Sequence, residues 1–157
     1  MIEDYFRPAD IDISNFDSSA DGLFSASDIY FSKGKFPKVH AHKIAIFGVD
    51  EYRGSPFKHS KESGADVVRT KLYQLKKHFS EVRVIDFGNL ILGATLEDTY
   101  VAIATVVSEL LPLKIIPVII GGSQDLTLGQ YGGYKRSEQI INIVSVDPGF
   151  EIGRAHV

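Results

Sequence analysis

The stretch Lys114–Gly129, KIIPVIIGGSQDLTLG, joins an apolar run to two glycines and a group of small polar residues. The run predicts a buried strand, and residues 125–134 predict a weak helix that its three glycines disfavour. Pro117 cannot donate to a strand ladder, so it predicts an edge position or a strand end. In an open parallel sheet, ligands gather just beyond the carboxyl ends of the strands. The turn at Gly121–Gly122 is therefore the first candidate site.

Upstream of this stretch, the sequence predicts two further pairs of strand and helix. Lys43–Asp50, KIAIFGVD, is an apolar run of the kind that forms a buried parallel strand, and Val82–Gly88, VRVIDFG, predicts a second strand. Between them, an apolar face at helical spacing predicts a helix. That face consists of Val68, Leu72, Leu75 and Phe79.

A longer helix follows the second strand. Thr95 is the expected N-cap, and Asp98 three residues later completes a capping box. The helix has an apolar stripe made of Leu96, Thr99, Ile103, Val106, Val107 and Leu110. Farther along the chain, Ile141–Gly149, INIVSVDPG, predicts a fourth strand.

Strands that alternate with helices of this length predict right-handed crossovers and a parallel sheet covered on both faces. The expected fold is a three-layer α/β/α sandwich, truncated to about four strands because few residues follow the last one. We expect residues 1–39 to form an extended arm and residues 40–157 to form a partial α/β domain. The arm should pack through its aromatic residues Phe6, Phe16, Phe24, Tyr30 and Phe31.

Composition excludes several classes of partner. The 157 residues carry a net charge of −3, and the basic residues are scattered rather than clustered, so nucleic acid and anionic membranes are not expected to bind. There is no cysteine, which excludes disulfides and thiolate zinc sites. The acidic N-terminus does not resemble a secretory signal, and the longest apolar region, Leu110–Ile120, is too short to cross a bilayer. These features predict a cytoplasmic protein.

Polar side chains follow the first predicted strand, in the segment GVDEYRG. This segment places Asp50, Glu51 and Arg53 where an acid and a guanidinium could bind a small polar ligand. The alternative is a solvated loop held by a local ion pair. The segment DFG at Asp86–Gly88 matches the magnesium-binding motif of protein kinases, but the sequence lacks the glycine-rich and catalytic loops that accompany that motif. Asp86 is therefore expected to be an acid at the end of the second strand. Five dispersed histidines are expected at the surface: His40, His42, His59, His78 and His156.

The turn GGSQD lacks the spaced glycines of a dinucleotide site, the lysine of a phosphate loop and the Gly-x-Ser-x-Gly elbow of a serine hydrolase. Its polar residues Ser123, Gln124 and Asp125 remain candidates, with Arg53, for binding a ligand. We expect Asp125 to cap the helix that follows and Gln124 to bond to Asp147 or to water.

Several of these stretches together resemble the ureohydrolase family of arginases, agmatinases and formimidoylglutamases, and in particular its formimidoylglutamase-like branch. They are IAIFGVDEYRG (44–54), GADVVRTKLYQL (64–75), VIDFGN (84–89), GATLEDTY (93–100), GGSQDLTLG (121–129) and VDPGFEIG (146–153). The resemblance covers the first half of a ureohydrolase domain. It implies a three-layer α/β/α fold and, in active members, a binuclear manganese centre that activates a hydroxide to attack a guanidinium or formimidoyl carbon.

The chain departs from the family at the metal ligands. The family motif Gly-Gly-Asp-His-Ser corresponds here to a turn in which Gln124 replaces the metal-binding histidine, between Ser123 and Asp125. In the second motif, Asp-Ala-His-x-Asp, only Asp147 matches and Glu151 is a chemical relative. A neutral amide is a poor substitute for imidazole, and each lost ligand costs on the order of 3 kcal/mol of metal affinity. The resemblance thus leaves Asp147 and Glu151 as ligands of a degenerate manganese site.

Three interpretations follow. The chain is a ureohydrolase-like protein that acts on carbon–nitrogen bonds of linear amidines or guanidino compounds, active or inactive. Alternatively, it is a non-catalytic module that holds a small amino-acid-like ligand or a partner chain in the same crevice. A third interpretation is that the natural protein is longer and that the ending GRAHV comes from a cloning vector or from a frame shift. An uncovered sheet edge also predicts a homo-oligomer.

Overall fold

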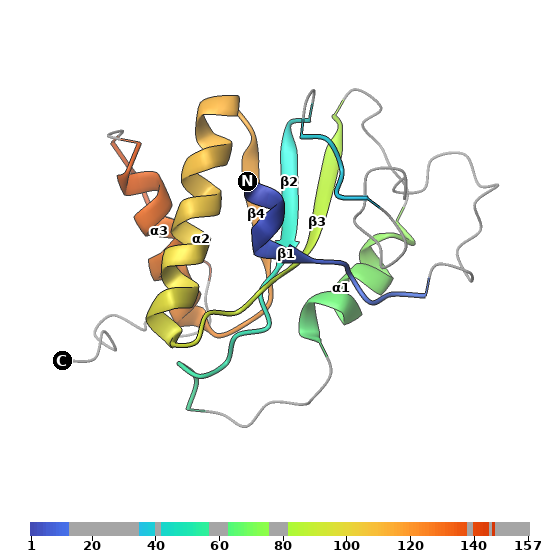
Figure 1. Ribbon diagram of the computed structural model, residues 1–157, viewed down its shortest axis with the longest axis horizontal. Coiled ribbons are helices and arrows are strands. Elements are labelled where there is room, and N and C mark those ends of the chain that lie inside the picture. Colours follow the sequence, from blue (N-terminus) through green and yellow to red (C-terminus); the bar gives the residue numbers. More distant parts are fainter. Residues whose placement is uncertain are drawn as a thin grey trace.

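Four strands form one mixed sheet in the computed structural model, which describes residues 1–12, 35–39, 42–56, 63–75, 82–137, 140–144 and 146 (Figure 1). The strands lie in the order β1-β3-β2-β4. They are β1 (Phe6–Arg7), β2 (Ile44–Gly48), β3 (Val84–Leu90) and β4 (Ile116–Ile120). β2 is parallel to both β3 and β4, as expected. The strands predicted at Lys43–Asp50, at Val82–Gly88 and in the apolar run that begins at Lys114 are therefore confirmed.

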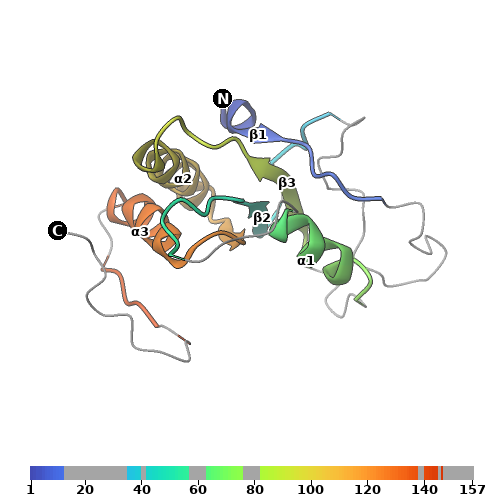
Figure 2. The same ribbon diagram turned by 90° about the horizontal axis from the view of Figure 1, so that it is seen from below.

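Helices cover both faces of the sheet. α2 and α3 lie side by side on one face and α1 lies on the other, which confirms the three-layer arrangement (Figure 2). The helices are α1 (Gly64–Leu72), α2 (Leu96–Leu110) and α3 (Thr127–Lys135), with 3-10 turns η1 (Ile2–Tyr5), η3 (Leu111–Leu113) and η4 (Gln124–Leu126). Thr95 caps α2 and forms the expected capping box with Asp98. Of the predicted stripe of α2, all but Leu96 are fully buried.

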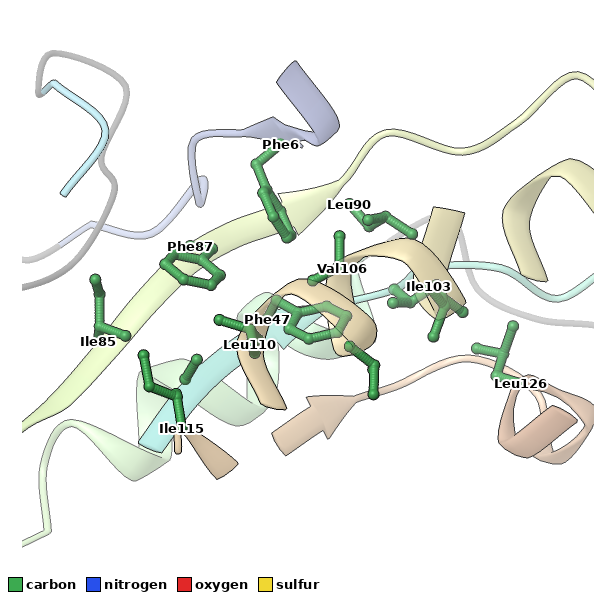
Figure 3. Packing of buried hydrophobic residues seen from close by; sticks show 13 residues of the cluster. Phe6, Phe47, Ile85, Phe87, Leu90, Ile103, Val106, Leu110, Ile115 and Leu126 are labelled. Atoms are coloured by element: carbon green, nitrogen blue, oxygen red, sulfur yellow. The ribbon is translucent and has the colours of Figure 1, made fainter. Parts of the chain in front are cut away.

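The core lies between the sheet and α2 (Figure 3). Phe47 of β2 and Phe87 of β3 are fully buried there, together with Ile103 and Val107 of α2. Phe6 joins them from the N-terminal segment, with its ring centroid 5.2 Å from that of Phe87 and 5.5 Å from that of Phe47. Aromatic pairs at these separations contribute beyond the area they bury.

The position of Phe6 explains why the sheet is mixed rather than parallel throughout. β1 runs antiparallel to β3, with Phe6 opposite Leu90. The amide of Ile91 donates to the carbonyl of Tyr5 at 2.8 Å, which extends the pairing by one residue. The expected arm thus contributes a short edge strand at its start, and burial of Phe6 holds it there. The other aromatic residues expected to pack the arm lie outside the described residues.

The buried face of α1 differs from the prediction. Val68 and Leu75 are exposed, and the helix ends at Leu72, before Leu75. The residues that α1 turns inward are Ala65, Asp66 and Arg69, followed by Tyr73 just past its end. The apolar spacing was therefore misleading, because the inner face of this helix is polar and is matched by polar groups on β3.

Two further expectations are wrong within the described residues. The described part of the predicted fourth strand, residues 141–144 and 146, is not a strand, and it lies exposed without a neighbouring strand in the sheet. His42 is buried rather than at the surface, and its Nδ1 lies 3.2 Å from the carbonyl of Val39. The four other histidines lie outside the described residues. Among the helices that are described, none is long and apolar enough to cross a membrane.

The expectation that Pro117 lies at an edge is confirmed. β4 is the last strand of the sheet, and Ile116 donates to Lys43 while Ile120 accepts from Val49, both across the β2 side. Because backbone groups alternate along a strand, those of Pro117 point to the open side, where a missing N–H breaks no bond. The loop after β2 lies against the start of α2 and against the turn after β4, through the bonds of Arg53 to residues 93–95 and of Glu51 to Ser123. A small cavity lies at the carboxyl end of β4, beside the turn Gly121–Gly122, where open parallel sheets bind ligands, and we refer to this place as the crevice.

Candidate functional site

The segments that follow β2 and β4 meet at this crevice. The amide and the hydroxyl of Ser123 both donate to the carbonyl of Glu51, at 2.8 and 3.2 Å. Gly121 and Gly122 have positive φ angles of 96° and 76°, which other residues rarely adopt. A Cβ on Gly122 would lie 2.7 Å from the carbonyl oxygen of Val49. The two glycines therefore let the turn approach the loop after β2 closely.

The Glu51 carboxylate is the buried centre of the junction, with 1% of the residue exposed. It accepts from the backbone amide of Arg53 at 2.9 Å, from its Nε at 3.0 Å and from its Nη2 at 2.5 Å. The Thr99 hydroxyl adds a bond of 3.1 Å from α2. Burial alone would raise the pKa of Glu51, but the hydrogen bonds from Arg53 and Thr99 hold that pKa below its ordinary value. Glu51 is therefore a paired carboxylate rather than a poised acid.

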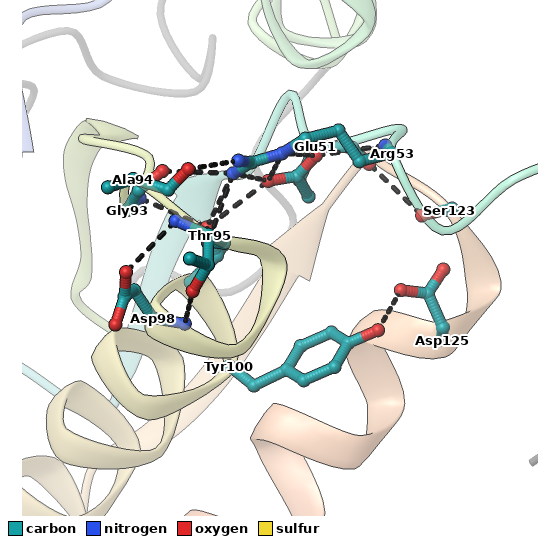
Figure 4. Close-up of polar contacts among 10 residues, drawn as sticks. Glu51, Arg53, Gly93, Ala94, Thr95, Asp98, Tyr100, Ser123 and Asp125 are labelled. Carbon is teal, nitrogen blue, oxygen red and sulfur yellow. Dashed lines mark hydrogen bonds and ion pairs between the residues drawn. The ribbon is translucent and has the colours of Figure 1, made fainter. Parts of the chain in front are cut away.

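Arg53 also reaches the start of α2 (Figure 4). Its Nη1 donates to the carbonyl of Ala94 at 2.7 Å, and its Nη2 donates to those of Gly93 and Thr95 at 2.9 and 3.2 Å. The side chain remains 43% exposed. The local ion pair considered as an alternative is present, and it ties the loop after β2 to the segment that leads into α2.

Asp125 faces α2 rather than the crevice. Its carboxylate accepts a hydrogen bond from the Tyr100 hydroxyl (Figure 4). Burial and this carboxylate raise the pKa of Tyr100 above its ordinary value of 10.0. The prediction that Asp125 caps the following helix is wrong. Neither η4 nor α3 has a side-chain cap, and the N-cap position of η4 is Ser123. Asp125 instead links the turn after β4 to α2.

A small cavity of about 190 Å³ opens beside the turn. Ser123 and Gln124 line it, and Arg53 and Asp125 do not. The remaining lining residues are Ile119, Gly121, Gly122, Leu126, Thr127 and Gln130. Pockets for drug-sized ligands are roughly 300–1,000 Å³, so this cavity suits only a small group. The structure thus places two of the four predicted ligand-binding residues at the cavity and the other two in the contacts that frame it.

A second polar cluster, which sequence reasoning missed, fixes α1 to β3. Arg69 has no exposed surface, and its guanidinium binds both carboxylate oxygens of Asp86, at 2.9 and 3.0 Å. It also donates to Asp66 at 2.9 Å, and the Tyr73 hydroxyl donates to Asp86. Asp86 therefore lies inside β3 and not at the strand end as expected. The available signal was the spacing of four between Ala65, Arg69 and Tyr73, together with an acid inside an apolar strand.

The described residues do not fit a two-metal centre. Ser123 is engaged with Glu51, and Asp125 is engaged with Tyr100. Within the described part of the chain, no three histidine or acidic side chains are grouped so as to hold a metal ion. The predicted ligands Asp147 and Glu151 lie outside the described residues, as does any contact between Gln124 and Asp147.

Comparison with known proteins agrees with this geometry. The model of the arginase family matches residues 42–153, well over half of the chain. This chain belongs to the arginase family. The match includes the loop after β2, the start of α2 and the turn after β4, which are the three segments that meet at the crevice. The family is generally metal-dependent.

Individual relatives of this arginase-family chain extend the comparison. A formimidoylglutamase from Streptococcus gordonii is 25% identical over 167 residues, which cover 97% of this chain and 50% of that protein. An agmatinase-like protein from Clostridium difficile has a similar fold, with a TM-score of 0.56 and 15% identity, over 64% of this chain and 40% of that one. The chain thus spans half the length of the formimidoylglutamase, and the structural match supports the fold.

Proposed function

We propose that this arginase-family protein acts on the carbon–nitrogen bond of a small linear amidine or guanidino compound, at the crevice beyond β2 and β4. The observation that carries the proposal is the 190 Å³ cavity beside the turn after β4, lined by Ser123 and Gln124. The names of the two relatives, a formimidoylglutamase and an agmatinase-like protein, support this substrate class.

The cavity has chemistry that suits such a ligand. An amidine or guanidinium carries several N–H donors, and the side-chain carbonyls of Gln124 and Gln130 are acceptors. Ile119 and Leu126 provide apolar walls. The neutral amides add no charge, so we expect modest affinity that depends on hydrogen-bond geometry.

The metal site is the feature in which this chain differs from the family pattern. We propose that Asp147 and Glu151 remain as ligands of a degenerate manganese site, and that Gln124 cannot replace the missing imidazole. No catalytic step is assigned to Glu51 or Asp125, because their carboxylates are already paired with Arg53 and Tyr100.

Manganese titration followed by an activity assay tests the proposal. Calorimetry of the metal-stripped protein, alongside Asp147→Ala, should show binding in the parent that the variant loses. The activity assay incubates the protein with manganese and measures the remaining formimidoylglutamate or agmatine by chromatography. The parent should consume one of these compounds, and the variant should consume neither. Absence of both binding and turnover would reject the catalytic proposal.

A second candidate, a binding module without turnover, is favoured by one observation. Gln124 stands where the family motif has a histidine, and the Asp125 beside it is engaged with Tyr100. On this alternative, the protein binds formimidoylglutamate or agmatine in calorimetry without consuming it, and added manganese leaves the affinity unchanged.

A further inference from the structure

We propose that Arg53 and Glu51 form a positioning pair that holds the turn Gly121–Ser123 in the geometry needed to bind a ligand. The inference rests on the proposed function, because it assumes that the cavity beside this turn is the ligand site. It assigns Arg53 a role that acts through Glu51 rather than by contact with the ligand.

The two ends of Glu51 bind different parts of the molecule. Its carbonyl accepts both hydrogen bonds from Ser123, and Ser123 lines the cavity. Its carboxylate is held by Arg53 and by Thr99 of α2. The position of the carbonyl, and hence of the turn, is therefore fixed by the bonds that the carboxylate makes.

The donors of Arg53 are already committed. Nε and Nη2 bind the Glu51 carboxylate, and Nη1 and Nη2 bind the carbonyls of residues 93–95. The rigid guanidinium fork can join a carboxylate to several carbonyls at once, which a lysine cannot do. The cavity is not lined by Arg53, so these contacts anchor the loop beside the ligand site.

Loss of Arg53 should loosen the turn without unfolding the sheet. Among the described residues, the Thr99 hydroxyl alone would remain as a side-chain donor to the buried Glu51 carboxylate, which would then move towards water. The Glu51 carbonyl would move with it and release Ser123. A displacement of about 1 Å at a site can cost on the order of 100-fold in function.

Two measurements on the full chain test the pair. The first is amide hydrogen exchange by NMR, comparing Ser123, which donates to Glu51, with Ile116, which donates to Lys43 at the other end of β4. The second is calorimetric binding of agmatine and of formimidoylglutamate. Arg53→Ala is the main variant, and Arg53→Lys replaces it if the first does not fold. Arg136→Ala is the matched control, because Arg136 is an exposed arginine that bonds to Thr105 of α2.

In Arg53→Ala, exchange at Ser123 should accelerate at least tenfold while Ile116 is unchanged, and ligand binding should weaken by roughly 10- to 100-fold. Arg136→Ala should change neither. Unchanged exchange at Ser123, equal acceleration at Ser123 and Ile116, or a loosened turn with undiminished binding would each overturn the inference. If the parent binds neither compound, the proposed function fails, and selective loosening at Ser123 alone still supports the positioning pair.

Discussion

At the scale of single residues, two buried charged side chains, those of Glu51 and Arg69, each hold separate parts of the molecule together. Each lies in a network of hydrogen bonds that joins a helix to the sheet or to a loop. Burying a charge is costly unless it is paired and hydrogen-bonded, and both networks meet that condition. Residues that look like catalytic candidates in the sequence are thus engaged in holding the fold.

Replacing Arg69 should be among the most destabilising single changes. Arg69→Leu leaves Asp86 buried without its guanidinium and Asp66 without its closest cation, so we expect a loss of about 3–5 kcal/mol in the free energy of unfolding. Urea denaturation followed by circular dichroism measures this loss. Arg136→Leu, at an exposed position, should cost less than about 1 kcal/mol. Similar losses in the two variants would contradict the importance of the buried network.

The Glu51–Arg53 pair predicts a pH dependence of stability. Because the pKa of Glu51 in the folded protein is lowered, its carboxylate contributes stability above the ordinary value of 4.5, and this contribution is lost as the pH falls through the folded pKa. In Arg53→Ala, the Glu51 carboxylate moves towards water and loses the guanidinium that lowers its pKa. The difference in unfolding free energy between parent and variant should therefore be largest near neutral pH and shrink below about pH 4. A difference independent of pH would show that the pair makes no electrostatic contribution.

At the scale of elements, the close packing of α3 on α2 depends on its glycines. A Cβ on Gly133 would lie 2.5 Å from the Cβ of Val107, whereas one on Gly132 would lie 3.4 Å from that of Ala104, in ordinary contact. The glycines that disfavour α3 as an isolated helix thus allow it to pack closely against α2.

Two alanine substitutions separate packing from helix propensity. Gly133→Ala should destabilise the protein by about 1–3 kcal/mol, because the new methyl group must push α3 away from α2. Gly132→Ala should be neutral or stabilising by up to about 1 kcal/mol, because alanine favours the helix and finds room. Thermal melts of both variants test this, and the reverse order of stabilities would refute the packing argument.

The elements that could be predicted from sequence are those whose patterns are local. β2, β4 and α2 follow from apolar runs, helical spacing and the cap at Thr95. The buried face of α1 could not be predicted in this way, because Arg69 is buried only when Asp86 of another element neutralises it. β1 was missed for a similar reason, since two residues carry no periodic signal and their partner is distant in sequence.

The candidate site shows the same limit. Glycines after an apolar strand were enough to locate the turn, and Ser123 and Gln124 line its cavity. The linking role of Glu51 could not be predicted, because it depends on where Ser123, Thr99 and residues 93–95 lie in space. An acid two residues before an arginine, just after a strand, was the only local indication of it.

At the scale of the whole molecule, the sheet has two different edges. Among the described residues, β1 pairs with the end of β3 at Asn89 and Leu90, and no strand pairs with the outer side of β4, where Val118 is 38% exposed and Ile116 is 59% exposed. Pro117 removes one donor from the open edge, and native proteins use proline to limit pairing there. Self-association through β4 remains a proposal, and the proline suggests that any pairing is short.

A charge on β4 tests that proposal. Light scattering of the parent at high concentration should give a mass above that of one chain, and Val118→Lys should return it to one chain, because an edge lysine disfavours strand pairing. Leu128→Lys, at an exposed site on α3, is the control and should not change the mass. A parent that is already a single chain would exclude association through this edge.

The pairing of β1 with β3 has a consequence for the order of folding. Phe6 meets Leu90 roughly eighty residues along the chain, so the contact closes a long loop for only two strand residues. We expect β1 to dock after the transition state, once β2, β3 and α2 have assembled. Stopped-flow kinetics of Phe6→Leu should then show faster unfolding with little change in the folding rate, and a slower folding rate would place β1 in the nucleus instead. On this view, the N-terminal segment does not initiate folding. It slows unfolding instead, and so determines the lifetime of the folded state.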